Sequence, residues 1–246
     1  MYLKKIIAVI PARGGSKGIK HKNLYKLNGK PLIEYTINAA RQSKYIDRIV
    51  VSTDDIQIAE VAKELGVEVP FLRPIEFALD TSNIIETVMD VISKLNLIED
   101  KYDSLILLQP TQPLRQAFHI DEAIEKYYMN EMQSLASVSK TNNHPLLIRE
   151  INKQGELTRI LNKNSTCRRQ DMSEAYFVNG CIYINALKEL STETSFNDNK
   201  IPYIMDKIYA VDIDEIDDIY LAEYYIKHYN IGKRYNHEHE RNARKL

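Results

Sequence analysis

The chain has 246 residues, of which 44% are hydrophobic and 27% charged, and its formal net charge is −1. That length can bury one sizeable α/β core with a small appendage. A near-zero net charge argues against a nucleic acid or an anionic membrane as partner, since both favour a basic excess. Two cysteines, Cys167 and Cys181, are too few for a disulfide framework, and the apolar run at residues 6–10 is too short for a spanning helix. We therefore expect a cytoplasmic protein with no nucleic-acid or membrane partner.

Short apolar runs alternate with amphipathic runs along the first two thirds of the chain, which is typical of βα units. Strands are predicted at residues 6–10, 48–52, 104–109, 134–139, 176–185 and 208–213. Helices are predicted after Pro31, after a cap at Thr53 or Asp54, and at residues 87–95, 120–128 and 215–229. This order predicts an α/β fold with a doubly wound, mainly parallel sheet.

The pattern changes after Ser139. Residues 141–172 are polar and show no helix of useful length, so we interpret them as a hairpin-like insertion that contacts a partner. The predicted division is a core of residues 1–138 and 179–231, a dimerisation insertion of residues 139–178 and a charged tail of residues 232–246. We expect a C2 homodimer through the insertion, with shared active sites if the insertion reaches across.

The segment PARGGSKGIKHKN, residues 11–23, follows the first predicted strand, where open α/β sheets bind ligands. Its glycines let backbone N–H groups approach an anion closely, and Arg13, Lys17 and Lys22 add positive charge. The segment matches neither GxxxxGK[ST] nor GxGxxG, which weakens a kinase or dehydrogenase interpretation. The alternative is a basic loop without a ligand. We favour a polyphosphate site.

The pair Asp212 and Asp214 lies near the end of the last predicted strand. Two residues apart in an extended chain, both carboxylates point the same way and can bind one hard cation. Asp214 has a second interpretation as the cap of the following helix. A lone DxD also occurs in glycosyltransferases, so the pair is weak evidence by itself.

The stretch IIAVIPARGGSKGIKHKNLYKLNGKPLIEYTI resembles the start of the acylneuraminate cytidylyltransferases, the CMP-sialic acid synthetases, and of relatives that activate legionaminic or pseudaminic acid. The resemblance continues in order through RIVVSTD, LRP, DT, LLQPTQPLR, NG, IYI and VDID. It implies transfer of CMP from CTP to the anomeric 2-hydroxyl of a nine-carbon 2-keto sugar acid, of N-acetylneuraminic or legionaminic type, with release of pyrophosphate.

The resemblance also implies roles for individual residues. Asp212 and Asp214 would hold Mg²⁺, and Arg13, Lys17 and Asp212 would be catalytic. The implied nucleotide-binding residues are Arg13, Gly14, Gly15, Ser16, Lys17, Lys22, Asn23, Arg73 and Thr81. The implied sugar-binding residues are Gln109, Arg169, Asn179 and Tyr183.

Some of these residues have other interpretations, and the chain departs from the family pattern twice. Gln109 can be a strand end satisfied by backbone, and Tyr183 can be part of a packed strand. For Arg115, we expect either an ion pair with surface carboxylates or a contact with ligand. Asn83–Ile84 replaces a small hydroxyl pair beside the segment that resembles the family's cytosine- and ribose-reading stretch. Phe177–Val178 replaces Arg-Pro, which removes one positive charge and favours a less polar sugar acid such as a legionaminic acid.

The expected mechanism is in-line attack of the sugar hydroxyl on the α-phosphorus, without a covalent intermediate, because no Ser-His or Cys-His pairing is evident. Three other functions stay open. The first is a nucleotidyltransferase that uses GTP, ATP or UTP with another sugar, which an assay across four nucleotides would separate. The second is a nucleotide-binding protein without turnover. The third is a glycosyltransferase that uses the DxD pair, although such a pair normally lies mid-chain.

Overall fold

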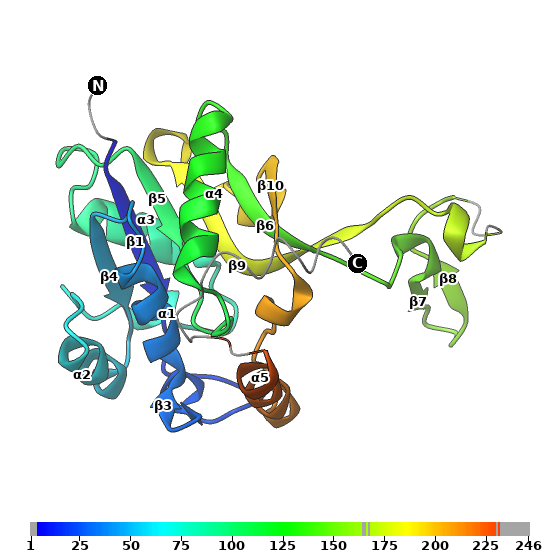
Figure 1. Cartoon of the computed structure of the whole chain (residues 1–246), viewed down its shortest axis with the longest axis horizontal. Helices are drawn as coiled ribbons and strands as arrows, with labels where there is room; N and C mark the ends of the chain where they lie inside the picture. Colours follow the sequence, from blue (N-terminus) through cyan, green and yellow to red (C-terminus); the bar gives the residue numbers. More distant parts are fainter. Residues whose placement is uncertain (1–3, 164–165, 167, 230, 232–246) are drawn as a thin grey trace.

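The computed structural model describes residues 4–163, 166, 168–229 and 231. A six-stranded sheet forms the centre of the molecule, in the order β10-β6-β9-β5-β1-β4 (Figure 1). β9 runs antiparallel to both of its neighbours, and the other neighbouring pairs are parallel. The strands are β1 (Ile6–Pro11), β4 (Arg48–Ser52), β5 (Ser104–Leu107), β6 (Leu135–Lys140), β9 (Tyr176–Ala186) and β10 (Ile201–Ile204). The predicted mainly parallel sheet is therefore confirmed.

Helices and short hairpins complete the structure. The α-helices are α1 (Leu32–Arg41), α2 (Ile56–Glu64), α3 (Ile84–Lys94), α4 (Ala117–Met129) and α5 (Ile216–His228). The hairpins pair β2 (Lys26–Leu27) with β3 (Lys30–Pro31) and β7 (Arg149–Ile151) with β8 (Leu157–Arg159). The 3-10 helices are η1 (Lys22–Leu24), η2 (Ile75–Phe77), η3 (Pro145–Leu147), η4 (Arg169–Asp171), η5 (Leu187–Glu189), η6 (Phe196–Asp198) and η7 (Lys207–Tyr209).

The first strand is apolar without interruption because both faces of the sheet are covered. Ile6, Ala8 and Ile10 pack into one buried cluster, whereas Ile7 and Val9 pack into another on the opposite face. Helices α1, α2, α4 and α5 contribute to the first cluster, and α3 contributes to the second. β1 lies between β4 and β5 and is parallel to both, so the loop that follows it leaves the sheet beside the carboxyl ends of these two strands.

The predicted strand at residues 208–213 is wrong. η7 and an irregular stretch occupy it, and the N–H of Ile213 donates to the carbonyl of Thr111 at 2.8 Å rather than to a sheet neighbour. Burial along residues 211–214 nevertheless alternates as it would in a strand. Val211 and Ile213 are buried, whereas Asp212 and Asp214 are exposed. One of the two edge strands, β10, was not predicted. It contains a proline, which an edge strand tolerates.

Two helix starts also differ from the prediction. Asp55, rather than Thr53 or Asp54, caps α2, because its carboxylate accepts the N–H groups of Gln57 and Ile58 at 2.7 and 3.1 Å. α3 begins at Ile84, three residues before the predicted start.

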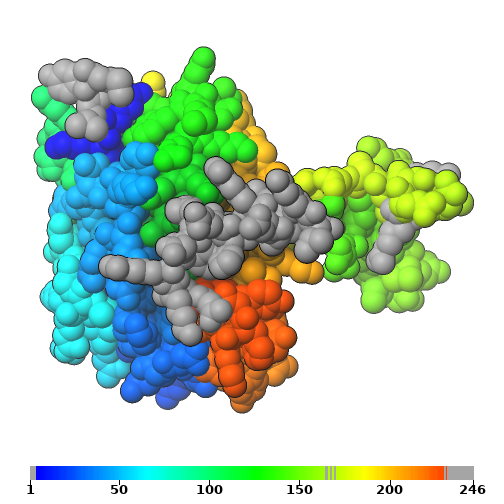
Figure 2. All heavy atoms as spheres, in the orientation of Figure 1, coloured from blue at the N-terminus to red at the C-terminus, as the bar shows by residue number. Residues whose placement is uncertain are grey.

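The described residues among 141–172 form an arm that stands away from the rest of the molecule (Figures 1 and 2). β6 and β9 lead into it, and the β7–β8 hairpin lies within it. The hairpin agrees with the interpretation from sequence, whereas the role of the arm in dimerisation stays a prediction. The predicted charged tail at residues 232–246 lies outside the described residues. None of the described helices has the length and apolar character needed to cross a bilayer.

Candidate active site

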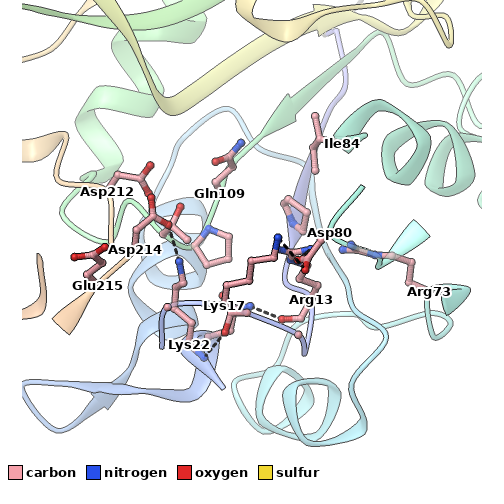
Figure 3. A pocket seen from close by; sticks show the side chains of 17 residues that line it. Arg13, Lys17, Lys22, Arg73, Asp80, Ile84, Gln109, Asp212, Asp214 and Glu215 are labelled. Atoms are coloured by element: carbon pink, nitrogen blue, oxygen red, sulfur yellow. Dashed lines mark hydrogen bonds and ion pairs between the residues drawn. The ribbon is translucent and has the colours of Figure 1, made fainter. Parts of the chain in front are cut away.

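A cavity of about 680 Å³ opens at the carboxyl ends of β1 and β5 (Figure 3). It receives residues from the loop after β1, from the segment before α3, from the loop after β5 and from the segment before α5. The predicted site residues that line it are Arg13, Gly15, Ser16, Lys17, Lys22, Asn23, Arg73, Gln109, Asp212 and Asp214. The structure thus brings together most of the residues that the sequence singled out, from opposite ends of the chain.

The basic loop is in direct contact with the segment that carries the two acids. Lys22 Nζ donates to the carbonyl of Ile213 and to Asp214 Oδ1, each at 2.7 Å. A Cβ placed on Gly18 would lie 2.1 Å from the carbonyl oxygen of Asp214, so only glycine permits this approach. The bond between Ile213 and Thr111 ties the same segment to the loop after β5. Three walls of the cavity are therefore fixed to one another.

Two further cations of the loop, Arg13 and Lys17, contact one carboxylate. Arg13 Nη1 lies 2.8 Å from Asp80 Oδ1, and Lys17 Nζ lies 3.3 Å from Asp80 Oδ2. The hydrogen bond from Lys17, together with the charges of Lys17 and Arg13, holds the pKa of Asp80 below its ordinary value. Each of the three cations, Arg13, Lys17 and Lys22, thus faces an acid inside the cavity.

Gly14 and Asn23 fix the path of the loop. Gly14 donates its N–H to Asp54 Oδ1 at 3.0 Å, and a Cβ there would lie 2.6 Å from Asp55 Oδ2, so this glycine packs against the start of α2. Gly14 is not among the lining residues, and its predicted nucleotide contact stays a prediction. Asn23 is buried, and its side-chain amide donates to the carbonyl of Arg13 at 2.8 Å, which fixes the path of the loop. Gly15 has open space around it.

Arg73 enters the cavity from the segment after β4. Its N–H donates to the carbonyl of Thr53 at 2.7 Å, which pins this segment to the end of the strand. The buried guanidinium donates to the hydroxyl of Ser52 at 3.1 Å, to the carbonyl of the same residue, and to the carbonyl of Phe77. Burial lowers the pKa of Arg73 to about 10. Thr81, by contrast, is exposed and lies outside the lining.

Arg115 holds the loop after β5, a role that the sequence did not indicate. The expectation that this residue pairs with surface carboxylates or touches ligand is wrong, because only 1% of its surface is exposed. Its guanidinium donates to the carbonyl of Cys181 at 2.6 Å, to the hydroxyl of Thr36 at 2.7 Å and to the carbonyl of Gln109 at 3.3 Å. Burial lowers its pKa to about 10. Gln109 therefore has a fixed backbone.

A second cavity of about 480 Å³ adjoins the first. The two cavities share Ile84 and Gln109 in their linings, so these side chains stand where the cavities meet. Tyr183 lines the second cavity, and its hydroxyl donates to Asn197 Oδ1 at 2.8 Å. Tyr183 is thus both a packed strand residue, 5% exposed, and part of a cavity wall.

The remaining predicted sugar-binding residues lie elsewhere. Asn179 is buried and lines neither of these cavities; its side chain bonds the hydroxyls of Ser137 and Ser139 at 2.5 and 2.9 Å and accepts the N–H of Cys181. The structure gives it a role in joining β6 to β9. Arg169 belongs to η4 in the arm, but its side chain lies outside the described residues.

Asp212 and Asp214 offer a donor set that suits Mg²⁺. Although Asp212 is exposed as a whole residue, desolvation of its carboxylate by the surrounding protein, and secondarily the neighbouring charge of Asp214, raises its pKa above the ordinary value despite a hydrogen bond from Thr111, so a bound cation would relieve an electrostatic cost. Mg²⁺ in phosphate sites commonly uses one or two carboxylates and completes its shell with phosphate oxygens and water. In the part of the chain that the structure describes, no group of three or more potential ligands occurs. The two acids fit a metal that is shared with a bound phosphate.

The capping interpretation of Asp214 is wrong. Glu215 is the N-cap residue of α5, and the N–H groups of Asp214 and Glu215 both donate to Asp218 Oδ2, at 2.9 and 2.8 Å. The side chain of Asp214 is left to face the cavity. Sequence reasoning did not single out Glu215 or Thr111 as lining residues, and it gave Asp80 no role of its own. Nothing in their local patterns distinguishes them, because only the folded chain brings them to the cavity.

Known proteins resemble this chain over most of its length. It is 40% identical to the CMP-N,N'-diacetyllegionaminic acid synthase of Legionella pneumophila, over 89% of this chain and 95% of that protein. It is 38% identical to the N-acylneuraminate cytidylyltransferase of Escherichia coli O18:K1:H7 over 89% of this chain, and spans about half (51%) of that longer protein. The pseudaminic acid cytidylyltransferase of Campylobacter jejuni is 30% identical over 89% of this chain and 95% of its own length.

Solved structures share the fold. A structure of CMP:2-keto-3-deoxy-manno-octonic acid synthetase in complex with CTP superposes with a TM-score of 0.67 at 16% identity, over 91% of this chain and 99% of that one. At so low an identity, this likeness is evidence for the fold alone. A family model described as cytidylyltransferase matches residues 7–231. Together with the 40% identical relative, this match confirms the resemblance found in the sequence: the chain belongs to the cytidylyltransferase family.

Proposed function

We propose that this cytidylyltransferase transfers CMP from CTP to the anomeric 2-hydroxyl of a nonulosonic acid and releases pyrophosphate. The observation that carries the proposal is the convergence of Arg13 and Lys17 with Asp212 and Asp214 on one cavity. The names of the relatives, which act on legionaminic, neuraminic and pseudaminic acids, support the acceptor class. The apolar pair Phe177–Val178 and the 40% identical relative favour an acceptor of the legionaminic type.

The two adjoining cavities suit two substrates that react with each other. CTP would occupy the first, where the loop cations bind its phosphates by charge-assisted hydrogen bonds, and the sugar acid would occupy the second. The acceptor hydroxyl would then meet the α-phosphorus beside Gln109 and Ile84. The amide of Gln109 would orient a polar group of either substrate, since Arg115 fixes its backbone. Positioning of this kind supplies much of the acceleration in phosphoryl transfer.

Charge neutralisation would supply the rest of the acceleration. Arg13 and Lys17 would stabilise charge on the α-phosphate and on the departing pyrophosphate. Asp212 and Asp214 would hold Mg²⁺, which when bound neutralises phosphate charge and favours ionisation of a bound hydroxyl or water. For Lys22, the contact with Asp214 indicates a role in placing that carboxylate as well as in binding phosphate.

We also propose that the enzyme is a cytoplasmic homodimer joined through the arm. The arm exposes the apolar side chains of Ile151 and Leu157, at 72% and 73%, and a second copy of the arm would cover such a surface. Arg169, on the same arm, would then approach the partner's sugar site, where its planar fork suits a carboxylate. The location follows from CTP as substrate and from the small number of cysteines.

The test is pyrophosphate release measured with each of the four nucleoside triphosphates and with neuraminic, legionaminic and pseudaminic acids as acceptors. We expect turnover with CTP and a legionaminic acid, and a dependence on Mg²⁺. Asp212→Asn should lower kcat by at least about 100-fold. Asp217→Asn, which makes the same charge change on the first turn of α5 outside the cavity lining, is the matched control and should be fully active. Turnover with another nucleotide, CTP binding without turnover, or full activity of Asp212→Asn would each refute the proposal.

A further inference from the structure

Asp80 occupies a position that the proposed reaction does not explain. It lies between η2 and α3, on the wall of the cavity that faces the basic loop (Figure 3). Both of its carboxylate oxygens are used, one by Arg13 at 2.8 Å and the other by Lys17 at 3.3 Å. In the structure, therefore, a protein carboxylate binds the same two cations that a phosphate chain would require.

The contacts are of a kind that a ligand can displace. The side chain of Asp80 is 44% exposed, and those of Arg13 and Lys17 are 36% and 79% exposed, so water and salt screen both ion pairs. Among the hydrogen bonds and ion pairs recorded for the described residues, Asp80 contributes side-chain contacts only to these two cations. Its loss would leave no buried group unpaired.

We propose that Asp80 is an internal competitor that holds Arg13 and Lys17 in the empty enzyme and yields them to a triphosphate. The inference rests on the proposed function in taking CTP as the ligand. A ligand that must displace Asp80 loses binding free energy equal to the free energy of the two ion pairs. A ligand that leaves the ion pairs intact binds with unchanged affinity.

The consequence is a cost in affinity that only phosphate ligands bear. A triphosphate carries enough negative charge to replace the carboxylate on both cations, whereas a nucleoside carries no charge and leaves the ion pairs intact. After transfer the pyrophosphate has separated from the nucleotide, and the return of Asp80 to Arg13 and Lys17 competes with the phosphate that remains. Asp80 therefore weakens the binding of phosphate ligands and favours departure of the pyrophosphate.

The experiment compares wild-type enzyme with Asp80→Asn in metal-free buffer, so that Asp212 and Asp214 hold no metal. Calorimetric or competition titrations measure binding of inorganic tripolyphosphate, CTP and cytidine. We expect Asp80→Asn to bind tripolyphosphate and CTP about three- to tenfold more tightly, as two exposed ion pairs allow, and cytidine with unchanged affinity. The gain should shrink at high salt, because salt screens exposed ion pairs.

The matched control is Glu76→Gln. Glu76 is an exposed acid four residues before Asp80, outside the cavity lining, and its replacement removes the same charge without freeing a loop cation. Its tripolyphosphate affinity should change far less than that of Asp80→Asn. An equal gain in the control would show that the effect is general electrostatics and would overturn the proposal.

The remaining outcomes are also decisive. Weaker binding of both CTP and cytidine by Asp80→Asn would mean that Asp80 reads the nucleoside, and unchanged tripolyphosphate affinity would mean that it does not compete with phosphate. Wild-type enzyme that binds neither CTP nor tripolyphosphate would sink the proposed function together with this inference. If the wild-type enzyme turns over CTP but Asp80→Asn shows no gain in affinity for tripolyphosphate or CTP, this inference alone would be wrong.

Discussion

Gly18 is the residue at which the two ends of the chain come closest. An added Cβ would meet the backbone oxygen of Asp214 at 2.1 Å, and a backbone atom cannot rotate away as a long side chain would. We expect Gly18→Ala to separate the basic loop from Asp214, to cost about 1–3 kcal/mol of stability and to lower kcat/KM for CTP. Thermal unfolding and steady-state kinetics measure the two effects.

Gly15→Ala is the control for the loss of stability. Gly15 is three residues away in the same loop, has nothing within 4 Å of an added Cβ and has no left-handed backbone, so its replacement should leave the melting temperature unchanged. Equal stability of Gly18→Ala and wild type would contradict the close approach.

At the scale of residues, sequence predicted the side chains that carry charge better than those that position them. Arg13 and Lys17 line the cavity because strand order alone brings the loops after β1 and β5 to one edge of the sheet. Asp212 also lines it, although the segment that carries it is not a strand and is held by the hydrogen bond from Ile213 to Thr111. Arg115 and Asn179 were misjudged for the opposite reason. Their burial depends on contacts with Cys181, Ser137 and other residues distant in the sequence, and no local pattern records those contacts.

At the scale of elements, α4 illustrates how a helix start can depend on a buried imidazole. His119 Nδ1 accepts the N–H of Gln116 at 3.1 Å, and its ring packs against Phe118 and Tyr209 at centroid distances of 3.9 and 4.5 Å. Burial, with a smaller contribution from the charge of Arg115, lowers the pKa of His119 to about 3. The neutral imidazole is therefore the form on which the fold depends.

The sign of the pH dependence follows. The unfolded chain binds a proton at His119 below about pH 6.5, whereas the folded chain does not until about pH 3. The stability that His119 contributes is present above pH 6.5 and declines as the pH falls, by up to about 1.4 kcal/mol per pH unit. The measurement is the free energy of unfolding from denaturant titrations between about pH 6.5 and 5, above the range where most carboxylates titrate. Over this range the free energy of unfolding of His119→Gln should fall less steeply than that of wild type. His228→Gln, at an exposed position on α5, should follow wild type. Parallel curves for His119→Gln and wild type would disprove the assignment.

Elements with one dominant pattern were predicted from sequence, and those with mixed patterns were not. β4 is found at the predicted residues because its apolar run is bounded on both sides. The stretch before α5 was mistaken for a strand because apolar and acidic residues alternate along it. In the structure their burial alternates too, but the stretch forms no ladder of hydrogen bonds with a neighbouring strand. β10 was missed because it is only four residues long and contains Pro202, which suggests a loop. Tertiary pairing, rather than local preference, decides both cases.

At the scale of the whole molecule, the arm is the feature with the clearest test. Ile151 and Leu157 face each other in the β7–β8 register and are both exposed. We expect the double variant Ile151→Asp, Leu157→Asp to be a folded monomer by light scattering, with reduced turnover if the sites are shared. The control is Ile98→Asp. Ile98 is also apolar and is 64% exposed, but it lies outside the arm, so this variant should remain a dimer. A wild-type monomer with full activity would rule out this assembly.

The sequence predicted an insertion at this place from the loss of βα rhythm. It could not predict the shape of the arm, because the direction in which a hairpin leaves a sheet depends on the strands that carry it. Here these strands are β6 and β9, whose pairing shifts register between Ala136 and Val138 before they enter the arm.

β9 spans both regions with a single run of backbone. Tyr176 stands at its arm end and Tyr183 in the wall of the second cavity, seven residues apart on one strand. Gly180, whose φ is 74°, and the register shift with β6 lie between them, so the two tyrosines are joined through a bulge. In the proposed dimer, assembly and acceptor affinity would be linked equilibria: by whatever factor the acceptor strengthened subunit association, association would strengthen acceptor binding.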